Sequence, residues 1–210
     1  MTSIAASERA LLCALAEEVG PGAPTLCAGW TVRDLVVHLL VREGHPAGLA
    51  TALPPLTRLL RRTTAKLSER DFGSLVQRLR HGPPRYSPLA LPGADAMVNL
   101  LELYVHHEDI RRAQPDWAPR PLPARTENGI WRTVTRTGRA LTVRSTVGVV
   151  AERSDTGERA TWKGGEDAVV LRGQPSELAL YAFGRQAQAV VETEGDPADV
   201  AALDRASLGI

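Results

Sequence analysis

The sequence is poor in cysteine and lysine, and it has almost no net charge. Cys13 and Cys27 are the only cysteines among 210 residues, too few for the disulfide framework of a small secreted domain. Basic and acidic residues number 25 and 24, which gives a formal net charge of +1. Arginine supplies nearly all the positive charge, because lysine occurs only at Lys66 and Lys163. This balance lacks the electrostatic footprint of a nucleic-acid-binding protein or of one that binds anionic membranes.

The sequence also has no long apolar run, and its first residues do not have the pattern of a signal peptide. No window approaches the roughly 18 uninterrupted apolar residues that a membrane-spanning helix requires. Residues 1–9 mix acidic and basic side chains before any apolar run and do not resemble a signal peptide. We therefore expect a cytoplasmic protein with free thiols and no membrane partner. No Gly-rich phosphate loop, nucleophile elbow or CxxC pair occurs, which argues against nucleotide chemistry and simple triad hydrolysis.

Apolar periodicity predicts helices over most of the first 141 residues, and β-branched residues become frequent after them. The expected helices cover about 7–19, 31–44, 54–81 (with a break between 68 and 73), 94–113 and 124–141. The expected later elements are strands at 142–150, 159–163, 168–171 and 189–193, and helices at 175–184 and 197–206. The sequence thus predicts an α+β protein with a helical bundle in residues 1–141 and a small α+β domain in residues 142–210.

The segment 101–110, LELYVHHEDI, carries two potential metal ligands. Glu102 and His106 stand four residues apart with no proline or glycine between them, so on a helix they share one face. Their neighbours are mostly apolar, and a buried carboxylate beside an imidazole costs several kcal/mol unless it is paired or bound to metal. His38 is a second such group, on the apolar side of the helix expected at 31–44. We predict that His38, Glu102 and His106 bind one divalent metal ion.

The same three residues allow a simpler alternative, in which Glu102 hydrogen-bonds to His106 and His38 is satisfied separately. If a metal is bound, two histidines and one carboxylate leave coordination positions for water and substrate. That donor set is typical of a catalytic Zn²⁺ rather than a closed structural site. It also suits iron, nickel or manganese, so zinc is the first expectation and the others stay open.

Five further residues are weaker candidates for a role in the metal site or around it. Asp109 could orient the second nitrogen of His106 or pair with an arginine. Asp34 lies one helical turn before His38, but capping the helix is its simpler role. Arg42 could bind a substrate carboxylate, and Cys27 is either reactive or inert packing. His107 lies about 100° around the helix from His106, which favours a packing role.

Two stretches resemble a known family. Residues 25–39, TLCAGWTVRDLVVHL, resemble the GWTV-x-DL-x-x-HL motif of the DinB-like metal-binding four-helix bundles. Residues 102–109 contain E-x-x-x-H followed by H-x-D, and this pattern resembles the mycothiol-dependent maleylpyruvate isomerase branch of that family. Residues 171–185 resemble the small α+β domain of that branch, which is similar to sterol-carrier folds. The resemblance implies a DinB-like bundle followed by a sterol-carrier-like domain. It also implies His38, Glu102 and His106 as metal ligands.

For function, the resemblance implies a metal-activated low-molecular-weight thiol, such as mycothiol, that attacks a small-molecule substrate in an isomerisation or a thiol transfer. The alternative is a non-catalytic metal- or ligand-binding protein of the same fold. A third possibility is an apolar bundle without metal.

Overall fold

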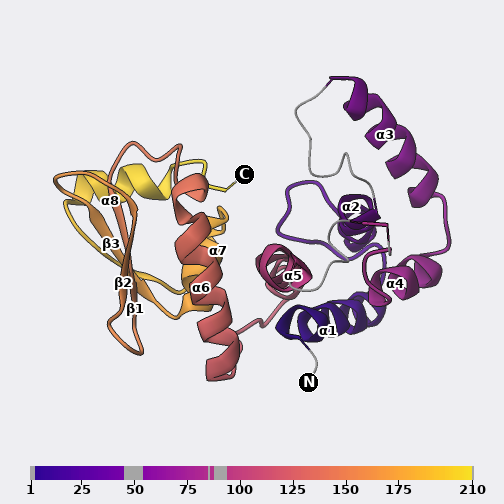
Figure 1. The fold of residues 1–210 in the computed structure, drawn as a ribbon, viewed down its shortest axis with the longest axis horizontal. Helices are drawn as coiled ribbons and strands as arrows, with labels where there is room; N and C mark the ends of the chain where they lie inside the picture. Colours follow the sequence, from indigo (N-terminus) through magenta and orange to yellow (C-terminus); the bar gives the residue numbers. More distant parts are fainter. Residues whose placement is uncertain (1–2, 45–53, 85, 88–93, 210) are drawn as a thin grey trace. The chain divides into compact units, whose positions relative to one another are not determined.

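A computed structural model describes residues 3–44, 54–84, 86–87 and 94–209, which divide into two compact units, Met1–Ala118 and Pro119–Ile210 (Figure 1). Helices make up the first unit, whereas a small sheet with its covering helices makes up the second. The predicted α+β organisation is confirmed. Within the described residues, no helix has the length and apolarity needed to cross a bilayer.

The first unit is a helical bundle. Its helices are α1 (Ile4–Val19), α2 (Val32–Gly44), α3 (Pro54–Ser68), α4 (Phe72–Arg80) and α5 (Ala94–Arg111). Helix α1 packs along α5 and α4, and α2 packs against α3 and α4. The break expected near residue 70 separates α3 from α4, where the Asp71 side chain accepts a hydrogen bond from Ser74 N and caps α4. The core between these helices is apolar, as Leu12, Leu35 and Leu39 are fully buried.

A capping box begins α2 and thereby sets the position of His38. The Asp34 carboxylate accepts hydrogen bonds from Thr31 N at 2.9 Å and from Thr31 Oγ1 at 2.6 Å. Asp34 N in turn donates to Thr31 Oγ1 at 3.4 Å. The structure therefore places Asp34 at the exposed start of the helix, in the capping role that its position favours.

Buried polar contacts join the helices of the bundle. Arg9 of α1 lies 2.7 Å from the Glu43 carboxylate of α2. His107 Nδ1 lies 3.0 Å from Glu8 Oε2 of α1, which accounts for the second histidine of the His106–His107 pair. His107 thus contacts α1 and serves the packing that its helical position predicts.

The second unit combines a four-stranded sheet with three α-helices among its described residues. Its elements are α6 (Ala124–Leu141), β1 (Val149–Arg153), β2 (Arg159–Lys163), β3 (Val169–Gly173), α7 (Pro175–Ala182), the short η3 (Gln186–Gln188), β4 (Glu192–Glu194) and α8 (Pro197–Asp204). The strand order is β2-β1-β3-β4, with β1 and β3 parallel and the other neighbours antiparallel. Helix α6 packs against α7 and β2, and α7 also packs against β3.

The largest differences from the expected elements concern the end of α6, and a smaller one is the strand expected at 189–193, which is β4 at Glu192–Glu194. The strand expected at 142–150 begins only at Val149, because the preceding residues close the end of α6: Thr142 N and Oγ1 both donate to Gly138 O, at 2.9 and 2.8 Å. Helix α6 groups with the sheet, so the compact units divide at 118/119 and not at the 141/142 boundary expected from the change in composition. The reason is local, since Gly138 lies directly against the buried Trp162 of β2.

Candidate metal centre

Three potential ligands from two helices converge in the first unit. Glu102 Oε1 lies 3.4 Å from His38 Nε2 and 3.4 Å from His106 Nε2. One donor atom from each of the three residues lies within 4.8 Å of the other two. Helix α2 supplies His38, whereas α5 supplies Glu102 and His106 one turn apart on one face. The structure therefore brings together the three residues predicted as a ligand set, and their role as ligands stays a prediction.

The spacing of these atoms fits a divalent cation. A tetrahedral zinc ion with bonds of about 2.0–2.2 Å separates its nitrogen and oxygen ligands by about 3.3–3.6 Å. Both measured distances from Glu102 fall in this range. Two imidazoles and one carboxylate also match the donor preference of zinc and of several other first-row metals. The residues present thus suit the metal that the resemblance implies.

The site is open on the side of His38. The His38 side chain is 36% exposed, against 19% for Glu102 and 10% for His106. The Trp30 ring lies at a centroid distance of 5.0 Å from the His38 ring, and Trp30 is itself exposed. A cation held by these three residues would therefore have an accessible side, with the Trp30 indole beside it.

Asp109 holds the other nitrogen of His106. Its Oδ2 lies 2.9 Å from His106 Nδ1, and its side chain is fully buried. A hydrogen bond at Nδ1 leaves Nε2, the atom nearest Glu102, as the acceptor or ligand nitrogen. Asp109 therefore lies where it can orient His106, which is one of the two roles considered for it from the sequence. Sequence reasoning missed the partner on its far side, since Cys27 Sγ lies 3.2 Å from the same oxygen.

Arg42 contacts the site from α2. Its Nε lies 3.3 Å from Glu102 Oε1, and its Nη1 donates to Asn99 Oδ1 at 2.5 Å. The guanidinium expected to bind a substrate carboxylate is therefore directed to a carboxylate of the protein. In this arrangement Arg42 orients Glu102 and offsets its charge.

The electrostatics of the cluster favour a charged Glu102 and a proton on His106. Burial would raise the pKa of Glu102, but hydrogen bonds from His106 and His38 and the charges of His106 and Arg42 hold it far below its usual range. Burial likewise opposes the protonation of His106. Hydrogen bonds with Asp109, Cys27 and Glu102 outweigh that effect and raise the His106 pKa well above its ordinary value.

These shifts predict how metal binding depends on pH. With its raised pKa, His106 carries a proton at neutral pH, and a metal ion must displace that proton from the ring. Glu102 is already ionised and contributes none. The metal affinity should therefore rise with pH, by about tenfold per pH unit for the proton that His106 releases and more steeply where a second ligand also releases one, until the pH passes the His106 pKa. Chelator competition between about pH 6 and 8 measures the slope, and a flat profile would contradict the protonated resting state.

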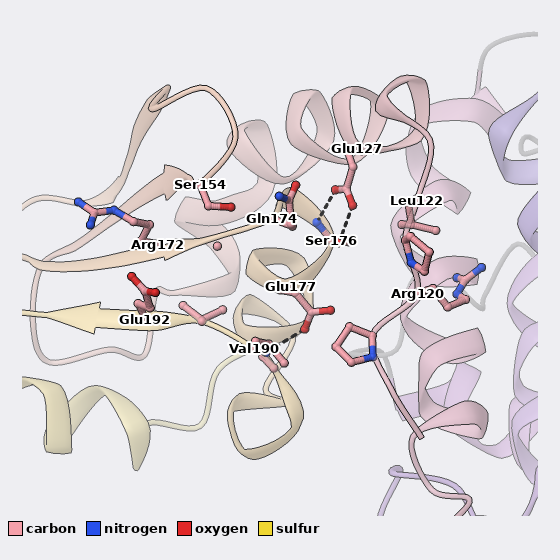
Figure 2. A pocket seen from close by; sticks show the side chains of 15 residues that line it. Arg120, Leu122, Glu127, Ser154, Arg172, Gln174, Ser176, Glu177, Val190 and Glu192 are labelled. Carbon is pink, nitrogen blue, oxygen red and sulfur yellow. Dashed lines mark hydrogen bonds between the residues drawn. The ribbon is translucent and has the colours of Figure 1, made fainter. Parts of the chain in front are cut away.

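The second unit contains a cavity of its own, of about 1000 Å³. Figure 2 shows that two carboxylates in its wall have partners within the unit: the Glu127 carboxylate accepts hydrogen bonds from Ser176 N and Oγ at 2.9 and 2.8 Å, and Glu177 accepts one from Val190 N at 2.9 Å. Burial nevertheless raises the pKa of Glu127, against the effect of the Ser176 hydrogen bonds. The Glu127 carboxylate thus stabilises the start of α7, and the Glu177 carboxylate stabilises the chain before β4. We therefore assign both of them a structural role.

Fold and candidate site define a DinB-like helical domain with a potential metal site, joined to a small sheet domain. Residues 3–87 match the family model described as the mycothiol maleylpyruvate isomerase N-terminal domain. This match covers the first part of the chain, and it confirms the resemblance predicted from the sequence. A search of curated proteins found no match.

Two solved structures share the fold over most of both chains. One is the crystal structure of the mycothiol-dependent maleylpyruvate isomerase, with a TM-score of 0.61, 18% identity, and coverage of 91% of this chain and 90% of that one. The other is a variant of the mycothiol-dependent maleylpyruvate isomerase in which a histidine is replaced by alanine, with a TM-score of 0.62, 17% identity and the same coverage. At this identity the likeness shows a common fold.

Proposed function

We propose that this protein is a metal-dependent enzyme that uses a low-molecular-weight thiol of the mycothiol type to isomerise a small electrophilic substrate in the cytoplasm. His38, Glu102 and His106 would hold the metal, with Zn²⁺ first and iron, nickel or manganese as alternatives. The observation that carries the proposal is the spacing of 3.4 Å from Glu102 Oε1 to both imidazole Nε2 atoms, at a site open on one side. The family of the N-terminal domain supports the thiol.

The chain's own residues prepare the site. A bound divalent ion supplies the means to lower the pKa of a thiol and present it as a thiolate at neutral pH. Asp109 holds a proton on His106 Nδ1 and directs Nε2 inward. Arg42 orients Glu102. The exposed edge of His38 and the Trp30 ring leave room for an organic ligand beside the three donors.

Isomerisation takes precedence over thiol transfer, which the sequence left equally open. The similar structures are both named as mycothiol-dependent isomerases, and this favours the first reaction class. The non-catalytic alternative has one observation in its favour, because Arg42 already offsets the charge of Glu102 without a metal. Binding of a low-molecular-weight thiol to the metal-loaded protein would favour the enzyme over the non-catalytic alternative.

The test begins with elemental analysis of untagged protein, for which we expect about one divalent metal ion per chain. The metal-loaded protein is then assayed with mycothiol and a panel of electrophiles, with and without thiol. Turnover should require both metal and thiol, and Glu102→Gln, which removes the anionic donor while keeping the size, should lose both metal and turnover. A metal-loaded protein with neither thiol binding nor thiol-dependent turnover would overturn the enzymatic proposal and leave the non-catalytic one.

A further inference from the structure

Cys27 lies close to the candidate metal centre without facing the three donors. Its Sγ donates to Asp109 Oδ2 at 3.2 Å and lies 3.9 Å from His106 Nδ1. The same Asp109 oxygen lies 2.9 Å from His106 Nδ1. A single buried carboxylate oxygen therefore joins the thiol to the back of the imidazole, on the side away from the Nε2–Glu102 contact.

The loop that carries Cys27 is fixed by its own hydrogen bonds. Thr25 Oγ1 donates to Trp30 O at 2.9 Å and accepts from Cys27 N at 3.2 Å, and Trp30 N donates to Cys27 O at 2.9 Å. Gly29, with a φ of 77°, makes the tight turn between them. The backbone of Cys27 is thus held in a compact turn by the Thr25 hydroxyl and by the Trp30 N–H.

Asp109 anchors this loop twice. Its backbone oxygen accepts a hydrogen bond from Leu26 N at 3.0 Å, next to Cys27 in the sequence. Its side chain accepts the thiol hydrogen bond. Both contacts are made by the same residue of α5. They therefore fix the position of the loop relative to the Asp109 carboxylate, and the carboxylate in turn fixes the orientation of His106.

We propose that Cys27 is a positioning residue of the metal centre, which holds the Asp109 carboxylate in the orientation that aims His106 Nε2 at the metal. This inference rests on the proposed metal site and adds a residue to it. Partners that hydrogen-bond to a ligating histidine, or to the group that orients it, commonly change metal affinity 10–100-fold when they are lost. Cys27 acts through one intervening carboxylate, so we expect a loss near 10-fold, at the lower end of that range.

The competing possibility is direct ligation. Cys27 Sγ, His106 Nδ1 and one Asp109 oxygen also lie within 4.8 Å of one another, so their donor set could hold a cation itself. In that case the thiol would be a ligand, and the His106 ring would bind metal through Nδ1 and not through Nε2. A thiolate bound to cobalt gives a charge-transfer band in the near ultraviolet, which a positioning residue does not give.

The experiment compares Co²⁺-loaded full-length protein with four variants. Cys27→Val removes the thiol donor at similar size, Cys27→Ser restores a donor, and Cys27→Ala is used if the valine variant does not fold. Cys13→Val is the matched control, because Cys13 is buried in α1 and its thiol approaches Val76 O. Metal affinity by chelator competition and the visible Co²⁺ bands are measured, with circular dichroism to verify folding.

We expect Cys27→Val to weaken Co²⁺ binding about 10-fold and to alter the visible bands, Cys27→Ser to recover most of both, and Cys13→Val to match the parent protein. Unchanged affinity and bands in Cys27→Val would overturn the inference. A near-ultraviolet thiolate band in the parent, lost in Cys27→Val, would overturn it in favour of direct ligation. If the parent binds no Co²⁺ at all, the proposed metal site fails and this inference fails with it, whereas loss confined to Cys27→Val leaves the metal site standing.

Discussion

Replacement of His106 by alanine should abolish stoichiometric metal binding, while replacement of its neighbour His107 should not. The two imidazoles are adjacent in α5 but face different surroundings: His106 Nε2 lies 3.4 Å from Glu102, and His107 Nδ1 lies 3.0 Å from Glu8 of α1. Loss of a direct ligand should lower the affinity by more than the 10–100-fold that outer partners contribute. Elemental analysis and chelator competition measure the effect.

The His107→Ala variant is a strict control, since it removes the same side chain one position away. It should keep its metal while losing stability, because the partner carboxylate of Glu8 is left buried. Full metal content in His106→Ala would refute the ligand assignment. Equal loss of metal in both variants would mean that the helix had been disrupted as a whole, and His38→Ala would then test the site from α2.

Replacement of Gly138 by alanine should destabilise the second unit by about 1–2 kcal/mol, the cost of overpacking less the gain in helix propensity. Alanine normally improves a helix interior by roughly 1 kcal/mol over glycine. At this position, however, a Cβ atom would lie 2.3 Å from Trp162 Cδ1 and 2.5 Å from Trp162 Nε1. Trp162 is only 1% exposed, so the ring has little room to move, and overpacking of this kind costs about 1–3 kcal/mol or more.

The matched control is Gly164→Ala, in the same unit. A Cβ at Gly164 meets no atom within 4 Å, so its effect should stay within about 0.5 kcal/mol. Denaturant unfolding followed by tryptophan fluorescence gives the free energy of unfolding of both variants. Equal stability of Gly138→Ala and the parent would show that α6 can move away from β2, contrary to the close packing described here.

Local signals in the sequence were sufficient for most helices. Proline and glycine mark their ends, and the expected helix at 124–141 coincides with α6, while that at 94–113 ends two residues beyond α5. The pairing of Glu102 with His106 follows from helical geometry alone. The convergence of His38 on them joins distant segments, and its expectation was strengthened by the resemblance of residues 25–39 and 102–109 to a known family.

Features that depend on contacts between distant segments were not predictable in this way. The assignment of α6 to the sheet unit depends on the fit of Gly138 to Trp162, which lie in separate elements. The strand expected from residue 142 failed because Thr142 bonds back to the end of α6. The contact of Cys27 with Asp109 requires the loop before α2 to dock on the end of α5, and no periodicity in either segment indicates it.

The placement of Glu102, His106 and Asp109 on one helix has a consequence for how this site can change in evolution. Consecutive residues of an α-helix are turned by about 100°, so the three groups share a face only while their spacing is kept. A single inserted or deleted residue between 102 and 106 would rotate Glu102 away from His106 by that angle, although every functional side chain would still be present. Segment 102–109 is therefore constrained in length as well as in residue type, and a relative with an altered spacing would be expected to have lost the site even with all its ligands retained.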